Sequence, residues 1–169
     1  MRNIILLMTL ILSGCMVPQS IQINAPFNEE QARKQLEKGN SSITGEAFLK
    51  KRDGGVVTCA GELVRLIPAT DYAKERLAHI YGSYEQSYRS FMIPAYQFEP
   101  NINSYDELQK VTRCNSLGHF EFNNIKNGEY FVITRVIWGP IGNSVYPEGG
   151  TIQYKIQVKD KNEHIVMGH

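Results

Sequence analysis

The chain has 169 residues, which is enough for a single domain with a sizeable core, and 42% of them are hydrophobic, as in an ordinary globular protein. Its 18 Lys and Arg nearly balance its 17 Asp and Glu, and removing Arg2, which lies in the leader described next, leaves 17 of each. This balance provides no electrostatic argument for binding nucleic acid or an acidic ligand.

The first 14 residues have the layout of a secretory signal peptide. Arg2 provides the positive start, an apolar run covers residues 4–12, and the small Ser13 and Gly14 follow. A run of about nine residues is much shorter than the roughly 20 that span a bilayer, so we expect no retained transmembrane helix. The leader therefore predicts export.

The end of the leader, Leu-Ser-Gly-Cys at residues 12–15, resembles the lipobox of bacterial lipoproteins. The resemblance implies cleavage before Cys15, a diacylglycerol thioether on its sulfur and acylation, as with palmitate, of the new amino terminus. Several acyl chains hold a protein on a membrane far better than one does. Met16 is not the Asp that usually retains such proteins in the inner membrane, so the resemblance implies an outer-membrane anchor. The domain then faces the periplasm, with exposure at the cell surface left open. An ordinary secreted protein with an incidental Cys15 is the alternative.

With Cys15 assigned to lipid, Cys59 and Cys114 remain as a single pair in an export pathway where disulfides form and persist. A bond between them closes a loop of about 56 residues, which stabilises the fold by about 4 kcal/mol in the chain-entropy model. Free buried thiols and a metal site are the alternatives, but no neighbouring Cys-x-x-Cys or His spacing supports a metal. We therefore predict a Cys59–Cys114 disulfide, with no metal and no cofactor.

A tether and a short helix are predicted after the lipid. Residues 17–27 contain two prolines and no sustained period, which is typical of an extended linker. Asn28 and Gln31 have the spacing of a capping box at the start of a helix. Glu30 and Lys34 lie one turn apart with the acid first, and we expect them to pair. A helix this short is marginal alone, so we expect it to lean on the domain.

The folded domain is predicted to begin near Ile43. Every second residue from Ile43 to Leu49 is apolar or small, which is the period of a strand, and Asp53-Gly54-Gly55 is typical of a hairpin turn. Residues 56–68 are predicted to form the returning strand or pair of strands, with an interruption at Gly61.

Residues 70–105 are predicted to be an insertion between strands. Helical spacing covers residues 71–81, and Gly82 ends the helix. A short edge strand is predicted within residues 90–98, because strand prolines are confined to edges. Tyrosine-rich loops make good binding surfaces, and the alternative is that these rings pack the insertion against the sheet. The candidate partner-binding residues are Tyr84, Tyr88, Phe91, Tyr96 and Phe98.

The centre of the domain is predicted in residues 112–138, as a hairpin of two strands. Phe120 and Phe122 alternate on the first strand, and residues 130–138 form the second. Both alternating sets of the second strand are apolar, whereas a sandwich strand covered on one side has polar residues on the other. We therefore expect the aromatic insertion to cover the second face.

Two more strands are predicted at residues 152–158 and 165–167. About seven strands delimited by turns predict a mainly β fold, a single antiparallel β-sandwich with a helix-containing insertion and an N-terminal helix. The predicted organisation is a signal peptide at 1–14, a lipidated tether and helix at 15–42, and the sandwich at 43–169.

One motif resembles the carboxypeptidase regulatory-like, transthyretin-like (prealbumin-like) sandwich domains. The motif reads Thr112-x-x-Asn115-x-x-Gly118-x-Phe120-x-Phe122, then Gly128-Glu129-Tyr130. The resemblance covers roughly residues 43–167 and implies an adhesive, stabilising or partner-binding module without shared catalytic residues. Asn115 stands where the family has Asp, which weakens the case for an ion at this turn.

No motif for catalysis stands out. The four histidines are scattered without metal-ligand spacing, and the sequence has no Gly-x-Ser-x-Gly elbow or phosphate-binding Gly loop. We therefore predict a non-catalytic, outer-membrane-anchored lipoprotein that binds another envelope protein or component. One alternative is a subunit of a secretion or conjugation apparatus. The other is an envelope hydrolase whose site brings together His79 or His119 with carboxylates such as Glu62, Glu129 and Glu148.

Overall fold

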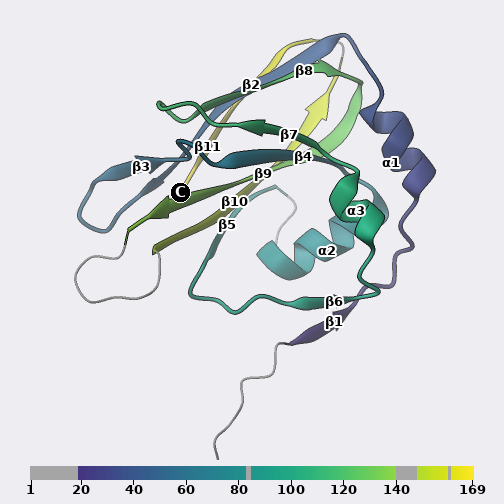
Figure 1. The fold of residues 1–169 in the computed structure, drawn as a ribbon, viewed down its shortest axis with the longest axis horizontal. Helices are drawn as coiled ribbons and strands as arrows, with labels where there is room; N and C mark the ends of the chain where they lie inside the picture. Colours follow the sequence, from purple (N-terminus) through teal and green to yellow (C-terminus); the bar gives the residue numbers. More distant parts are fainter. Residues whose placement is uncertain (1–18, 83–84, 140–147, 160) are drawn as a thin grey trace, which may run out of the picture.

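The computed structural model describes residues 19–82, 85–139, 148–159 and 161–169. The predicted mainly β sandwich with a helix-containing insertion and an N-terminal helix is confirmed. Two sheets are stacked, and the helices gather to one side of them (Figure 1). In chain order the elements are β1 (Ser20–Gln22), α1 (Glu29–Leu36), β2 (Ser41–Lys50), β3 (Val56–Thr58), β4 (Leu63–Pro68), α2 (Asp71–Tyr81), β5 (Gln86–Ser90), β6 (Gln97–Glu99), α3 (Asn103–Glu107), β7 (Lys110–Arg113), β8 (His119–Ile125), β9 (Gly128–Trp138), β10 (Glu148–Val158) and β11 (Glu163–Gly168).

The smaller sheet is built around β2. Every second residue from Ser41 to Leu49 is buried, so the predicted alternation is confirmed. β2 pairs antiparallel with β3 and β8 on one side and parallel with β11 on the other. The β11 ladder is parallel because the chain reaches β11 from the other sheet and not through a tight hairpin.

The larger sheet has the strand order β5-β10-β9-β4-β7, with β9 in the centre. Tyr130, Val132 and Val136 of β9 point into the core between the two sheets. Phe131 points to the opposite side, into a second apolar cluster, and Ile133 packs against that cluster. The central strand is therefore covered on both faces, as its residues require.

The predicted hairpin at residues 112–138 is wrong. β8 and β9 are both present, but β8 pairs with β2 in the smaller sheet, whereas β9 pairs with β4 and β10 in the larger one. The physical reason lies in their outer faces. Glu121 and Asn123 of β8 are exposed, which suits a sheet with one face in solvent. Both faces of β9 are apolar, so this strand needs a sheet that is covered on both faces.

The motif at residues 112–122 builds the turn that leads into β8. The side-chain oxygen of Asn115 accepts hydrogen bonds from the backbone N–H groups of Leu117 (2.9 Å) and His119 (3.0 Å). Gly118 has φ of 86°, and a Cβ there would lie 2.6 Å from the Cβ of Thr58. The amide oxygen of Asn115 thus serves as the acceptor in this turn. Gly118 is required because its φ is positive and because a side chain there would collide with Thr58.

The insertion covers the second face of β9, as predicted. α2 spans Asp71–Tyr81 and ends at Gly82 in the left-handed conformation. Tyr72, Ala73 and Leu77 of this helix are buried against Phe131 in the second cluster. The cluster also contains Phe98 and Tyr105. Phe98 therefore packs the insertion against the sheet, which was the alternative to its role as a binding residue.

The predicted linker is wrong for its described part, residues 19–27. β1 pairs in parallel with β6, and Ile23 is only 6% exposed in the second cluster. The Glu75 carboxylate accepts hydrogen bonds from the backbone N–H of Asn24 (2.9 Å) and of Ala25 (2.7 Å), which lower its pKa. A three-residue strand whose partner lies more than seventy residues away leaves no recognisable period in the sequence.

α1 begins as predicted and leans on the domain. The Asn28 side chain caps the helix by accepting from the N–H of Gln31 at 2.9 Å, and Ala32 is buried. The hydroxyl of Tyr130 lies 2.9 Å from the carbonyl oxygen of Gln35, joining the helix to β9. The same hydroxyl lies 2.8 Å from the carbonyl oxygen of Lys126.

The ion pair found on this helix joins Glu29 to Arg33 at 2.6 Å, and not Glu30 to Lys34 as predicted. Glu29 also interacts with Ser104 next to it, and both contacts lower its pKa. Sequence spacing does not indicate whether Glu29 or Glu30 forms the ion pair. In the structure the contact with Ser104 of α3 favours Glu29.

The edge strand predicted within residues 90–98 lies earlier in the chain. β5 pairs with β10 at the edge of the larger sheet and ends at Ser90. Residues 97–99 form β6, which pairs with β1. Pro94 lies in the segment between the two strands, where no ladder requires a backbone donor.

The predicted disulfide is present. Cys59 and Cys114 have Cα atoms 5.8 Å apart and are separated by 55 residues. Cys59 follows β3 of the smaller sheet and Cys114 follows β7 of the larger one, so the bond joins the two sheets. Both residues are buried, at 0% and 3% exposure.

Replacing both cysteines by alanine should lower the free energy of unfolding by about 4 kcal/mol, because the unfolded chain loses a cross-link around a long loop. Urea denaturation monitored by circular dichroism measures this. The reduced wild-type chain is the matched control and should lose a similar amount. Equal urea midpoints for the oxidised wild type and the double variant would contradict a stabilising bond.

Candidate functional site

The predicted binding residues do not form one surface. Cys15 and Tyr84 lie outside the described residues. Tyr88 packs against the core between the sheets, where its hydroxyl donates to the carbonyl oxygen of Gly149 at 3.0 Å. Phe91 is half-buried just after β5. Tyr88 is therefore separated from Phe98 and Tyr96, which belong to or pack against the second apolar cluster.

Tyr96 and Phe98 are brought together, with ring centroids 6.2 Å apart. The guanidinium of Arg89 lies over the Tyr96 ring at 4.4 Å, and that of Arg76 lies over the Phe98 ring at 4.3 Å. We call Arg76, Arg89, Tyr96, Phe98 and Tyr105 the arginine–aromatic cluster. Arg76 completes it by lying 5.1 Å from the centroid of Tyr105.

Arg89 also holds three segments together. One of its terminal nitrogens donates to the carbonyl oxygen of Ile80 at the end of α2 (2.9 Å), and the other donates to that of Pro94 (2.6 Å). Because Arg89 is itself on β5, its planar fork joins the helix, the edge strand and the following turn.

The two arginines of the cluster have no ion-pair partner in the structure's described part. Arg76 donates to the hydroxyl of Tyr72 at 3.2 Å, and Arg89 donates to backbone carbonyls, so both side chains are positioned by neutral partners. Two guanidinium groups held by neutral partners thus lie together in a chain whose overall charge is balanced.

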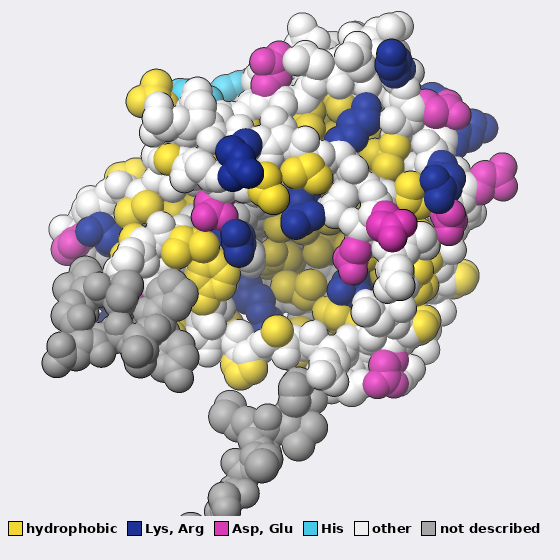
Figure 2. Space-filling view, viewed as in Figure 1, with side chains coloured by type: hydrophobic (Ala, Val, Ile, Leu, Met, Phe, Trp, Pro, Cys, Tyr) yellow, Lys and Arg dark blue, Asp and Glu magenta, His cyan; other side chains and the backbone are white. Residues whose placement is uncertain are grey.

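This face of the molecule is hollowed. Figure 2 shows a central depression with apolar side chains on its floor and Lys or Arg side chains within it. In the same view in Figure 1, α2, β5 and β6 surround this position. An apolar floor with a few charged groups is the usual composition of a ligand site.

Sequence reasoning identified Tyr96 and Phe98 but missed the arginines. Arg76 lies on what looks like the charged face of a helix, and Arg89 lies in a short strand without an obvious period. The sequence does show arginines among the aromatic residues of the insertion. That composition predicts stacking between a particular arginine and a particular ring only when the two segments are known to be adjacent.

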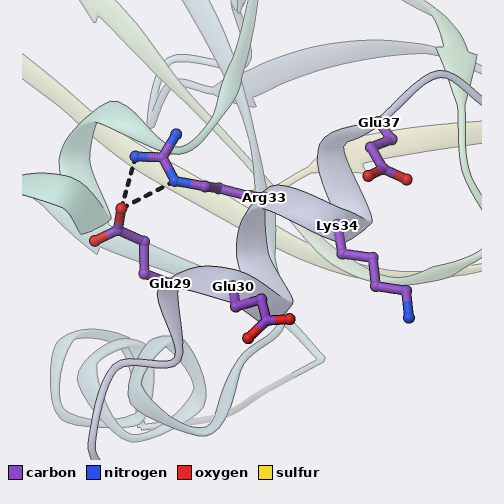
Figure 3. Close-up of a pocket in the computed structure, with 5 residues that line it drawn as sticks. All are labelled: Glu29, Glu30, Arg33, Lys34 and Glu37. Carbon is purple, nitrogen blue, oxygen red and sulfur yellow. Dashed lines mark hydrogen bonds and ion pairs between the residues drawn. The ribbon is translucent and has the colours of Figure 1, made fainter.

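A second depression lies over α1 and is shown in Figure 3. Its walls all come from one helix, with Glu29 and Arg33 paired on one side and Glu30, Lys34 and Glu37 on the others. No other element closes it, and Glu37 is already paired with Lys126 at 2.9 Å. This is the solvated charged face of a helix and carries no site.

The carboxylates that a hydrolase would need are kept apart. Glu129 and Glu148 lie at opposite ends of the β9–β10 ladder, about 30 Å apart at roughly 3.3 Å per residue. Glu129 is paired with Lys74 at 3.0 Å and Lys155 at 2.9 Å. Glu62 is paired with Arg135 at 2.8 Å.

The histidines also stay on the surface. His119 lies opposite Glu46 on the smaller sheet, with 3.5 Å between Nδ1 and the carboxylate, and both side chains are exposed to solvent. His79 is exposed on α2. Among the described residues, no group of three or more His, Cys, Asp or Glu side chains is arranged to hold a metal ion. No helix of residues 19–169, outside the gaps in the description, is long and apolar enough to cross a membrane.

Replacing Arg89 by alanine should lower the free energy of unfolding by about 3 kcal/mol, because two hydrogen bonds from a charged donor, each worth about 1.5 kcal/mol or more, are lost. Limited proteolysis should then cut residues 91–96 faster. Arg52→Ala, in the exposed turn after β2, is the control and should leave stability unchanged within about 0.5 kcal/mol. Identical urea midpoints for the two variants would show that Arg89 holds nothing in place.

The comparisons with known proteins support the fold. A scan of protein-family models and a search of curated proteins find no match to this sequence. Among solved structures, the chain is similar to a Pseudomonas aeruginosa protein described as a "putative carbohydrate binding protein". The TM-score is 0.68 and the identity 20%, over 86% of this chain and 100% of the other. At that identity the likeness establishes a shared fold.

Proposed function

We propose that this chain is an outer-membrane-anchored periplasmic lipoprotein that binds another envelope component without catalysing a reaction. The lipobox at residues 12–15 supports the anchor, and the disulfide supports an exported domain. The arginine–aromatic cluster, whose residues come from α2, β5 and the chain around β6 and α3, is the observation that carries the binding role.

The chemistry of the cluster favours a glycan that bears acidic groups. Aromatic rings pack against the C–H faces of sugar rings, and the planar guanidinium binds carboxylate or phosphate through two parallel hydrogen bonds. Arg76 lies over the buried ring of Phe98 and Arg89 lies over Tyr96, so the parts of the cluster that a ligand can reach are the partly exposed Tyr96 and the two guanidinium groups. The description of the Pseudomonas aeruginosa neighbour as a carbohydrate binder agrees with this choice.

The absence of catalysis is part of the proposal. Glu129, Glu62 and Glu46 are each paired with a Lys, Arg or His side chain, and the Glu148 carboxylate accepts a hydrogen bond from the ring N–H of Trp138. The envelope hydrolase is the weaker candidate for that reason. Membership of a secretion or conjugation apparatus predicts a high-mass complex after detergent extraction, and crosslinking in intact envelopes separates all three classes.

The anchor is tested by labelling cells with radioactive palmitate. The wild type should incorporate label and fractionate with outer membrane, and Cys15→Ser should incorporate none, because the acceptor sulfur and the cleavage site are lost. Expression of both chains is compared by immunoblot. Equal label in wild type and variant would refute lipidation at Cys15.

Binding is tested by co-sedimentation of the chain with purified cell-wall sacculi, which carry glycan and carboxylates. Arg76→Gln with Arg89→Gln should weaken the affinity about a hundredfold or more, since two charged hydrogen bonds worth about 1.5–3 kcal/mol each are lost and about 1.4 kcal/mol is tenfold. Lys50→Gln with Arg52→Gln removes the same charge at a distant turn and should bind normally.

Melting curves identify any loss of fold in the Arg89 variant. Arg76→Gln alone keeps the Arg89 contacts and should still weaken binding. Equal binding by the folded arginine variants and the control pair would refute the cluster as the glycan site.

A further inference from the structure

The turn after β5 exposes an unusual run of apolar side chains. Met92 is 73% exposed and Ile93 is 48% exposed, and the next two residues, Pro94 and Ala95, are exposed as well. No charged residue interrupts the run. Four consecutive exposed apolar residues are disfavoured in water unless they contact something, so this turn needs a partner surface.

The turn is held in a defined shape. The N–H of Ile93 donates to the carbonyl oxygen of Ser90 at 3.2 Å, and the N–H of Met92 donates to the Ser90 hydroxyl at 3.2 Å. The N–H of Phe91 donates to the carbonyl oxygen of Gly149 at 3.1 Å, and Arg89 holds Pro94. The apolar side chains are therefore presented by an ordered support.

The turn lies beside the point where the chain enters the fold. The N–H of Gln97 donates to the carbonyl oxygen of Gln19 at 3.0 Å, and Ser20 pairs with Gln97 at the start of the β1–β6 ladder. In Figure 1 the start of β1 and the segment between β5 and β6 share the lower edge of the molecule. Ile93 is four residues from Gln97, hence within about 14 Å of it at 3.6 Å per residue.

The lipid-bearing residue is close to the same edge. Only residues 16–18 separate Cys15 from Gln19. Covalent geometry limits that span to about 14 Å, even for a fully extended chain. Because β1 fixes Gln19 to the fold, a lipid on Cys15 brings this edge of the domain, and not another, to the bilayer surface.

We propose that the Met92–Ile93 turn inserts into the interfacial layer of the membrane that holds the lipid anchor. This inference rests on the proposed lipidation of Cys15. The occupant is a lipid surface because the acyl chains at Cys15 place that surface within reach of the turn, and because apolar side chains without charge suit the boundary between headgroups and acyl chains. The turn then fixes the orientation of the sandwich relative to the membrane. The domain is held against the membrane surface and does not move freely on a flexible tether.

The test uses the full lipidated chain, reconstituted into vesicles of phosphatidylethanolamine and phosphatidylglycerol with brominated acyl chains. Trp138, the one tryptophan, is first replaced by phenylalanine. Met92→Trp is then compared with Leu117→Trp, a matched site that is 69% exposed in the turn between β7 and β8 on the opposite, upper edge in Figure 1. Bromine quenches tryptophan only where the ring reaches the acyl chains.

Fluorescence at position 92 should fall by about twofold relative to unbrominated vesicles, and fluorescence at position 117 should not change. Addition of Ile93→Asp to the Met92→Trp chain should restore the signal, and melting curves confirm that all variants fold. Vesicle flotation separates the two proposals. Chains that float but show equal quenching at both positions overturn the turn's insertion and leave the anchor intact. If the chain isolated from cells carries no lipid and does not float with the vesicles, the anchor is overturned, and this inference with it.

Discussion

The two apolar faces of β9 impose the arrangement of the other layers. Val132 and Phe131 point to opposite sides of the same strand and are both fully buried. Burying a side chain of this size stabilises the fold by about 2–3 kcal/mol, but only if the face of the sheet on which it lies is covered and shielded from water. One cover is the smaller sheet, which the disulfide ties to the larger one. The other cover must come from residues outside a two-layer sandwich, and the insertion between β4 and β7 supplies it.

That third layer has two consequences for function. It brings the rings of Phe98 and Tyr96 beneath the guanidinium groups of Arg76 and Arg89, so two arginines and two rings lie together in a chain of balanced charge. It also binds the N-terminal segment through β1 and Ile23, which leaves a very short connection to Cys15. The same layer therefore positions the proposed glycan site and the edge of the domain that we propose faces the membrane.

Local patterns were sufficient wherever the interaction partner is near in sequence. The extent of α2, the capping of α1 by Asn28, the alternation in β2 and the turn at Gly54 all follow from neighbouring residues. Prediction failed for pairings over a long distance. β8 was assigned to β9 because the two are consecutive, but their outer faces place them in different sheets. β1 was missed because its ladder partner, β6, is itself three residues long.

The sequence by itself determined the fold class, the Cys59–Cys114 bond and the need for a cover on β9, because these depend on residue type, period and count. Only the tertiary structure decided which aromatic candidates act together. It separated Tyr88 from Tyr96 and Phe98, and it added two arginines that local patterns place on solvated faces. The reason is that stacking and charge depend on distances between segments, which the order of residues along the chain does not specify.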